Sequence, residues 1–153
     1  MTVRQSMREN LKLLSKDASN ADEKIDAMVA MMGLDTALAD RYPRQLSGGQ
    51  VQRMAVARGL VTEPNMLLCD EMTSALDVSA QAMILQYLYE LRMKRGLTML
   101  FESHDLALCS TFCDRIAIMQ DGEIVEIDTP EQIMDNPQHE YTKLLLDAVL
   151  YVR

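Results

Sequence analysis

The arrangement that most constrains the fold is a pair of short apolar runs separated by one helical stretch. The runs are MLLC at residues 66–69 and LTMLF at residues 97–101, and residues 79–95 between them repeat apolar side chains at helical spacing and stop at Gly96. A strand, a crossover helix and a second strand favour two parallel strands in one sheet. Because neither run alternates with polar residues, both strands are predicted to be fully buried.

The first half of the chain has the periodicity of amphipathic helices. Residues 3–14 predict one helix, and apolar side chains at helical spacing over residues 25–32 predict another. Asn20 and Glu23 have the spacing of a capping box at the start of the second helix, and Gly33 is placed to end it. This half is therefore predicted to be a helical subdomain.

The last third of the chain contains a hairpin pattern followed by helices. In RIAIMQDGEIVEI, at residues 115–127, two apolar segments flank Asp121 and Gly122, which is typical of a two-residue β-turn. Helices are predicted over residues 105–112, 130–135 and 140–150.

Composition limits the class of protein. The 153 residues are 48% hydrophobic and 25% charged, as in globular domains, and no apolar run is long enough to span a membrane, so we expect a soluble, cytoplasmic protein. A net charge of -8 argues against a nucleic-acid partner. Cys69, Cys109 and Cys113 form no CxxC pair, which favours packing roles over a disulfide framework or a metal site.

The segment LSGGQ at residues 46–50 stands directly before a helical pattern. Ser47 and Gln50 have the spacing of a capping box, and Gly48 and Gly49 allow another molecule to approach the backbone closely. Free N–H groups and the helix dipole favour an anion at such a helix start. The segment predicts a phosphate-binding site, although many helices begin with Ser-Gly and bind nothing.

Acidic residues and a histidine follow the two predicted strands. Asp70 and Glu71 come directly after the first strand, and Ser103-His104-Asp105 follows the second. Ligands of parallel sheets bind at the carboxyl ends of strands, so these side chains are candidates for work on a metal ion or substrate. The alternatives are a solvated strand end and a structural histidine, which is the more frequent role of a lone histidine.

Four motifs in the sequence, by their order and spacing, resemble those of the ATP-binding cassette (ABC) family of ATPases. They are LSGGQ at 46–50, MLLCDE at 66–71, TSALD at 73–77 and SHD at 103–105. The resemblance covers essentially the whole chain. It implies an α/β fold, in which a helical signalling subdomain precedes the carboxyl-terminal part of a RecA-like parallel sheet of the P-loop NTPase type. The implied divisions are residues 1–62, which end in the LSGGQ helix, residues 63–127 for the partial ATPase core, and residues 128–153 for the final helices.

The resemblance also implies a role for each motif. Residues 47–50 would contact the γ-phosphate of ATP held by the opposite protomer of a head-to-tail dimer. Asp70 would act on Mg²⁺, Glu71 would be the general base that polarises the attacking water, and His104 would reach the γ-phosphate. Asp77 would belong to a loop that signals across the dimer. The implied cofactors are ATP and Mg²⁺, and phosphoryl transfer depends on such positioning and charge neutralisation.

A narrower resemblance concerns the ALDVSAQA segment at 75–82 and NPQHEYTKLLLDA at 136–148. Both are similar to cassettes of dipeptide, oligopeptide and nickel importers. The implied partners are a second cassette subunit and transmembrane permease subunits, with docking through residues 3–40. The protein would then lie at the inner face of the cell membrane.

The 153 residues contain no G-x-x-x-x-G-K-[ST] phosphate loop, so the resemblance is to the back portion of a cassette. The resemblance also implies that the strand feeding the phosphate loop lies between the strand that ends near His104 and the strand at 115–119. Without it two strands lack a neighbour, and we expect a marginal or self-associating protein unless the missing part is supplied. One alternative function is a non-catalytic interaction module that acts in trans on an intact cassette or a membrane subunit. A chromosome-maintenance ATPase is less favoured, because no heptad repeat flanks the motifs and the chain is acidic.

Overall fold

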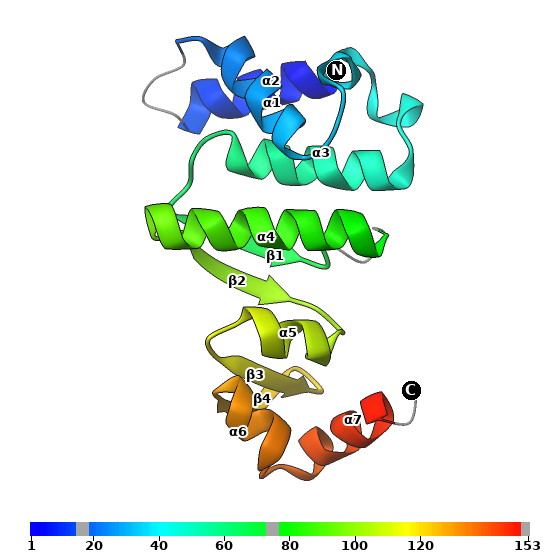
Figure 1. The fold of residues 1–153 in the computed structure, drawn as a ribbon, viewed down its shortest axis with the longest axis vertical. Coiled ribbons are helices and arrows are strands. Elements are labelled where there is room, and N and C mark those ends of the chain that lie inside the picture. Colours follow the sequence, from blue (N-terminus) through cyan, green and yellow to red (C-terminus); the bar gives the residue numbers. More distant parts are fainter. Residues whose placement is uncertain (15–18, 73–76, 151–153) are drawn as a thin grey trace. The chain divides into compact units, whose positions relative to one another are not determined.

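The computed structural model describes residues 1–14, 19–72 and 77–150 of the chain (Figure 1). They divide into two compact units, Met1–Leu100 and Phe101–Arg153. TSALD, except for Asp77, lies outside the described residues. The division into 1–62, 63–127 and 128–153 follows the motifs and remains a prediction.

The first unit opens with the predicted helical subdomain. Helix α1 (Val3–Leu14), α2 (Ala21–Met31) and α3 (Gly48–Leu60) pack on one another, with the short 3-10 turns η1 (Thr36–Asp40) and η2 (Pro43–Gln45) between α2 and α3. The apolar side chains of these helices are buried where the helices pack together. Five of them are fully buried, namely Met7 and Leu11 of α1, Ile25 and Val29 of α2, and Met32 directly after α2.

Arg4 joins three elements of the helical subdomain. Its guanidinium lies 2.7 Å from an Asp40 oxygen and 2.8 Å from an Asp26 oxygen, and it also donates to the Thr36 carbonyl over 3.3 Å. The hydrogen bond to Asp40 raises the pKa of Arg4 above its ordinary value, and the guanidinium lowers the pKa of Asp40 in return. The first turn of α1 is thereby attached to α2 and η1.

The start of α2 differs from the sequence-based expectation. Asn20 has left-handed backbone angles, φ 54° and ψ 34°, and its side chain makes no capping hydrogen bond. A capping side chain reaches the N3 amide only from extended backbone, so the predicted Asn20–Glu23 capping box is wrong. The predicted end of the helix is confirmed, since Gly33 follows it with φ 66°.

The first unit also contains the predicted strand–helix–strand segment. Strand β1 (Met66–Asp70), helix α4 (Val78–Arg95) and strand β2 (Thr98–Glu102) follow one another, and β1 pairs with β2 in a two-stranded sheet. The two strands run in the same direction in Figure 1, with α4 as their crossover. The boundary between the two units falls within β2.

The prediction that both strands are fully buried is wrong. Along β1 and β2 every second side chain is exposed, including Met66, Leu68 and Leu100, whereas Cys69 on the opposite face is buried. The covered face packs on helix α3, where Leu67 Cδ1 lies 3.3 Å from the ideal Cβ position of Gly59. The described residues therefore cover one face of this sheet only.

The second unit is a hairpin covered by three helices. Strands β3 (Ile116–Gln120) and β4 (Glu123–Asp128) pair antiparallel with an irregularity between Ile118 and Met119. The predicted turn is confirmed, because Asp121 and Gly122 both have positive φ, at 51° and 85°, as a type I′ turn requires. The helices are α5 (Leu106–Phe112), α6 (Pro130–Asp135) and α7 (Glu140–Leu150).

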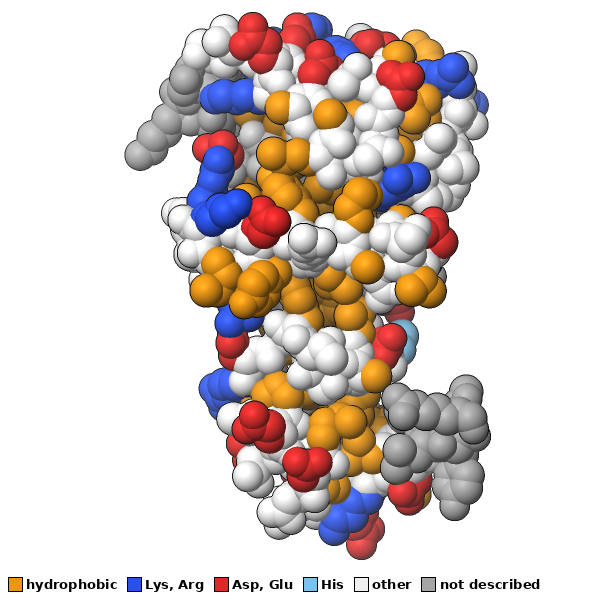
Figure 2. Space-filling model, viewed as in Figure 1, with side chains coloured by type: hydrophobic (Ala, Val, Ile, Leu, Met, Phe, Trp, Pro, Cys, Tyr) orange, Lys and Arg blue, Asp and Glu red, His pale blue; other side chains and the backbone are white. Residues whose placement is uncertain are grey.

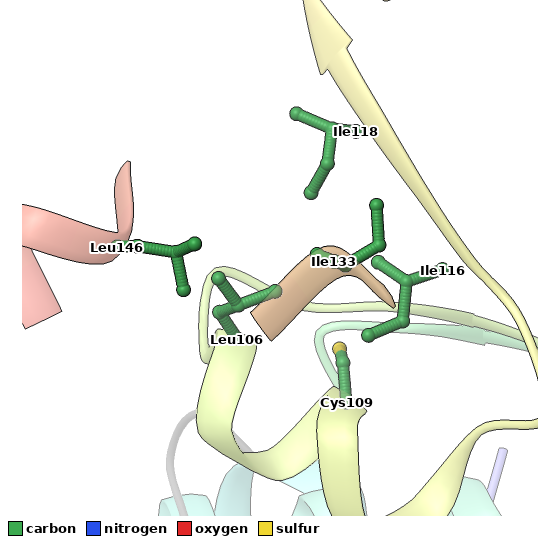
Figure 3. Packing of buried hydrophobic residues seen from close by; sticks show 6 residues of the cluster. All are labelled: Leu106, Cys109, Ile116, Ile118, Ile133 and Leu146. Atoms are coloured by element: carbon green, nitrogen blue, oxygen red, sulfur yellow. The ribbon is translucent and has the colours of Figure 1, made fainter. Parts of the chain in front are cut away.

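One apolar cluster holds this unit together (Figure 3). Side chains from α5, β3, α6 and α7 point toward a shared centre, in which Ile133 is fully buried. Cys109 is part of the cluster, and its hydrogen bond with Cys113 and its burial raise the pKa of its thiol. The labelled members are Leu106, Cys109, Ile116, Ile118, Ile133 and Leu146.

A carboxylate connects the hairpin to the last helix. Glu126 of β4 accepts hydrogen bonds from the backbone N–H groups of Gln138 at 2.8 Å and His139 at 3.0 Å, just before α7 begins. The Nδ1 atom of His139 in turn accepts from the N–H of Tyr141. His139 thus has a local structural role. Among the described helices none has the length and hydropathy of a membrane span.

Candidate functional site

The LSGGQ segment forms the beginning of helix α3. Ser47 has extended backbone angles and its Oγ accepts the Gln50 N–H at 3.3 Å, while Gln50 Oε1 accepts the Ser47 N–H at 3.0 Å. The predicted capping box is therefore confirmed. These two side chains satisfy two of the amides at the helix start, and the positive end of the helix dipole lies at Gly48 and Gly49.

Among the described residues, no contact requires glycine at position 48. Gly48 does not have a positive φ, and a Cβ built there would meet no atom within 4 Å. Ser47 and Gly48 are exposed. The backbone at Gly48 is therefore open to close approach by another group.

Asp70 and Glu71 stand at the carboxyl end of β1 with different backbone conformations. Asp70 is the last residue of the strand, whereas Glu71 has left-handed backbone with φ 42°. Both are exposed. A left-handed conformation is unfavourable for a residue with a Cβ and persists where the surroundings fix it. The two adjacent acids therefore differ in backbone conformation at the strand end.

Gln52 joins the LSGGQ helix to this strand end. Its Nε2 atom donates a hydrogen bond of 2.9 Å to the backbone carbonyl of Glu71. Arg53, the next residue, donates to the carbonyls of Gly49 at 3.4 Å and Met32 at 3.3 Å, so the first turns of α3 are also attached to the end of α2. Within the first unit, the helix that begins with LSGGQ is thus hydrogen-bonded to the backbone of Glu71.

Sequence reasoning did not identify Gln52 or Arg53. Each follows LSGGQ on the same helix, but nothing in the sequence tells which backbone carbonyl a helical amide or guanidinium will reach. Helical spacing from Ser47 was the one available signal, since it places position 52 in the second turn.

Asp77 begins helix α4. Its carboxylate accepts hydrogen bonds from the Ser79 hydroxyl at 2.6 Å and the Ala80 N–H at 2.9 Å. Both bonds favour the ionised form and lower the pKa of Asp77 below its ordinary value, with the Ser79 hydroxyl as the larger cause. Asp77 is thus an N-cap in this structure, and its predicted signalling role remains a prediction.

His104 lies in the second unit, in the connection between β2 and α5, and is exposed. Its neighbours are arranged by local hydrogen bonds. The Asp105 N–H donates to Ser103 Oγ at 3.0 Å, and the Asp105 carboxylate caps α5 by accepting the Leu108 N–H at 2.9 Å. LSGGQ, Asp70 and Glu71 therefore all belong to the first unit, and the second unit carries His104.

The described residues contain no group of three or more His, Cys, Asp or Glu side chains that is able to hold a metal ion. A Mg²⁺ site does not need such a group, because Mg²⁺ is commonly held by one or two carboxylates together with water and substrate phosphates. The exposed Asp70 carboxylate at a strand end fits that requirement.

Comparison with known proteins first defines the class. Residues 1–74 match the family model "ABC transporter". The fold matches a dimeric bacterial ABC transporter cassette, MJ0796, with a TM-score of 0.77 and 31% identity over 85% of this chain and 57% of that one. The same cassette bound to ADP and Pi gives a TM-score of 0.78. Over most of its length the chain is therefore similar to the ATP-binding cassettes of ABC transporters, and its predicted α/β fold is confirmed.

Within that class, the matched sequences include subunits of peptide importers. The oligopeptide transport ATP-binding protein OppF of Salmonella typhimurium is 40% identical over 151 residues, which are 97% of this chain and 45% of the relative. The dipeptide transport ATP-binding protein DppF of Escherichia coli is 45% identical over 126 residues, or 82% of this chain and 38% of the relative. The chain spans about half the length of the curated relatives it matches, or less.

Proposed function

We propose that this chain is the carboxyl-terminal portion of the ATP-binding subunit of a peptide importer, and that the complete cassette hydrolyses ATP to drive uptake. The observation that carries the proposal is the hydrogen bond between Gln52 and the Glu71 carbonyl. This hydrogen bond connects helix α3, whose first turn is of a kind that binds phosphate, to the end of strand β1, which bears two carboxylates. The names of the peptide-transport relatives support the substrate class.

In this function the LSGGQ segment binds phosphate. Ser47, Gly48, Gly49 and Gln50 meet the γ-phosphate of ATP held by a second cassette subunit in a head-to-tail dimer. The open space at Gly48 supports this role, because phosphate oxygens must approach the amide groups closely. The dimeric form of the solved relative supports the pairing of two cassettes.

The acidic pair serves the nucleotide held by its own cassette. Asp70 would hold Mg²⁺, usually through water, and the ion supplies charge neutralisation when it is bound. Glu71 orients the attacking water and accepts its proton as the general base, and His104 contacts the γ-phosphate. Asp77, which is fixed at the start of α4, carries the signal between the two halves of the dimer.

The remaining partners follow from the same proposal. Transmembrane permease subunits hold the cassette at the inner face of the cell membrane, with the helical subdomain as the docking region. The transported substrate is a peptide, recognised outside this chain. Nucleic acid is not a partner, in keeping with the net charge of -8.

The test is ATP hydrolysis by a complete cassette. A fusion that places the amino-terminal portion of E. coli OppF, up to the matched region, before residues 1–153 is expected to hydrolyse Mg-ATP. Glu71→Gln should lower kcat about 100-fold or more, as removal of a general base does, with little change in the KM for ATP. Glu63→Gln, at an exposed glutamate outside the site, is the matched control. An active Glu71→Gln fusion would refute the assigned base.

The isolated chain gives a complementary measurement. Calorimetry with Mg-ATP up to millimolar concentration should detect no binding to residues 1–153 alone, because they contain no phosphate-loop motif. Micromolar binding would place the nucleotide on this chain itself and would favour a different function.

A further inference from the structure

Gln52 holds a backbone group that belongs to a different element. It lies in the second turn of helix α3, is half-buried, and donates a hydrogen bond of 2.9 Å to the carbonyl of Glu71, 19 positions along the chain. The helix that carries Gln52 is fixed by buried side chains, among them Met54, Val56 and Leu60. A donor on a packed helix holds its acceptor in a defined place.

Residues 66–70, which lead to Glu71, carry no side-chain donor comparable to a carboxamide. MLLC at 66–69 is apolar, and a carboxylate such as that of Asp70 accepts hydrogen bonds without donating them. Figure 2 shows hydrophobic side chains at the surface in the part of the view where α4, β1 and β2 lie in Figure 1. The polar contact at the Glu71 carbonyl therefore comes from another element, and Gln52 supplies it.

The backbone conformation of Glu71 makes this contact consequential. Its φ of 42° lies in the left-handed region, where a residue with a Cβ persists only when the surroundings fix it. Cys69 before it and Met72 after it retain 3% and 9% of their full exposure, and their buried side chains fix where the segment lies. A hydrogen bond to a carbonyl has a preferred direction, so the bond from Gln52 also fixes how the peptide group after Glu71 is turned.

The orientation of this peptide group determines where the Glu71 carboxylate can reach. The carbonyl carbon and the Cβ atom are bonded to the same Cα, so a change in the backbone angles of Glu71 moves its side chain relative to the end of β1. The side chain is exposed, and water therefore has access to it. A general base must lie within hydrogen-bond reach of the water whose proton it accepts, and a displacement of about 1 Å can lower the rate about 100-fold.

We propose that Gln52 is a positioning residue for the general base. Its hydrogen bond to the Glu71 carbonyl holds the Glu71 carboxylate where it meets the attacking water, and Gln52 takes no part in the proton transfer itself. This inference rests on the proposed function, in which Glu71 is the base. The helix that begins with LSGGQ then has two roles, because its first turn binds phosphate and its second turn orders the base.

The test uses the fusion of the OppF amino-terminal portion with residues 1–153. Gln52→Met keeps the length of the side chain but removes the donor, and it should lower kcat about 10-fold or more with less than about a 2-fold change in the KM for ATP. Gln52→Lys keeps a donor at a similar reach and should restore most of kcat. Gln86→Met, at an exposed glutamine on α4, is the matched control and should change neither constant.

A double-mutant cycle separates positioning from a general structural role. Glu71→Gln removes the base, so the addition of Gln52→Met should not lower the residual kcat further, whereas two independent losses would multiply. Multiplied losses would overturn the proposal, because Gln52 would then act through another group. An undiminished kcat in Gln52→Met, or an equal loss in Gln52→Met and Gln52→Lys, would overturn it as well.

The conformation of Glu71 is measured on residues 1–153 without nucleotide. Its backbone chemical shifts report the left-handed conformation, and they should move toward extended values in Gln52→Met and stay in place in Gln86→Met. Unchanged hydrogen exchange in α1–α3 shows that the variants are folded. A fusion that hydrolyses no ATP would refute the proposed function, while the shifts still decide whether Gln52 sets the conformation of Glu71. Hydrolysis with unaltered shifts and kcat in Gln52→Met would refute this inference alone.

Discussion

Glu71 combines an unusual backbone conformation with a proposed catalytic role. A glutamate with φ 42° adopts a region that residues with a Cβ seldom occupy, so its neighbours must hold it there. The hydrogen bond from Gln52 to its carbonyl is a contact that does so. The place of Glu71 after a strand made it a candidate for work on a metal ion or substrate, and the family resemblance implied the role of general base. Neither its backbone conformation nor its contact with Gln52 was predictable, because both depend on tertiary packing.

Gln52→Ala is expected to loosen the strand end without unfolding the unit. Loss of one exposed hydrogen bond should lower the free energy of unfolding by about 0.5–1.5 kcal/mol, and the amides of residues 70–72 should exchange faster. Urea denaturation and hydrogen exchange measure the two effects. Gln86→Ala, at an exposed glutamine on α4, is the control and should change neither. If the exchange at 70–72 is unaltered in Gln52→Ala, another contact holds Glu71.

Elements were predicted well where the signal is local. The α4 helix ends at Gly96, which has φ 67°, and the hairpin turns at Asp121-Gly122, since both depend on residues adjacent in sequence. The Asn20 cap was wrong because several residues satisfy the capping pattern and the chain path selects among them. The exposure of Leu68 was missed for a different reason. An apolar run indicates that both faces of a strand are suited to burial, but it does not show whether the described residues cover both faces.

The contact between Glu126 and α7 predicts a pH-dependent helix start. Burial acts to raise the pKa of Glu126, but the Gln138 N–H, the Thr142 hydroxyl and the His139 N–H together outweigh it, and the pKa lies below its ordinary value. A lowered folded-state pKa means that the stabilisation is complete above the unfolded value of about 4.3 and is lost as the pH falls through the folded value. Below about pH 4, amides at the start of α7 should exchange faster.

The measurement is a pH titration of the α7 amides by NMR or hydrogen exchange. Glu126→Gln should weaken the start of α7 at neutral pH and remove most of the acid dependence. Glu123→Gln, on the same strand at an exposed position, should keep the acid dependence of the unmodified chain. An unchanged titration in Glu126→Gln would assign the effect to another group.

At the scale of the whole molecule, the described buried side chains belong to two hydrophobic cores, one in each unit. Ile25 is fully buried in the first unit and Ile133 in the second. Cooperative units of this kind open with separate free energies when each has its own core. The sequence predicted helical and α/β regions. The boundary between the two units, which falls within β2, was not predictable, because it depends on which residues pack together in three dimensions and not on the order of the motifs.

Ile133→Ala should destabilise the second unit by about 2–5 kcal/mol, the usual cost of removing a fully buried isoleucine side chain. Hydrogen exchange should then rise across β3, β4, α6 and α7, while α1–α3 keep their protection. Ile133→Val should have a milder effect of the same pattern, about 0.5–1.5 kcal/mol. Ile25→Ala is the reciprocal variant. Equal loss of protection in both units would show that they unfold together.

The exposed apolar side chains of the β1–β2 sheet, Met66, Leu68 and Leu100, bear on how such a protein is made in the cell. If the rest of the proposed cassette precedes these strands on one polypeptide and packs on them, it has already left the ribosome when Leu68 and Leu100 emerge, and the apolar face is covered during synthesis. If the portions are made separately, the face stays exposed until the two polypeptides meet, so the yield depends on their concentrations and on chaperone capacity. Genetic arrangement would then control folding yield without any change in the mature contacts.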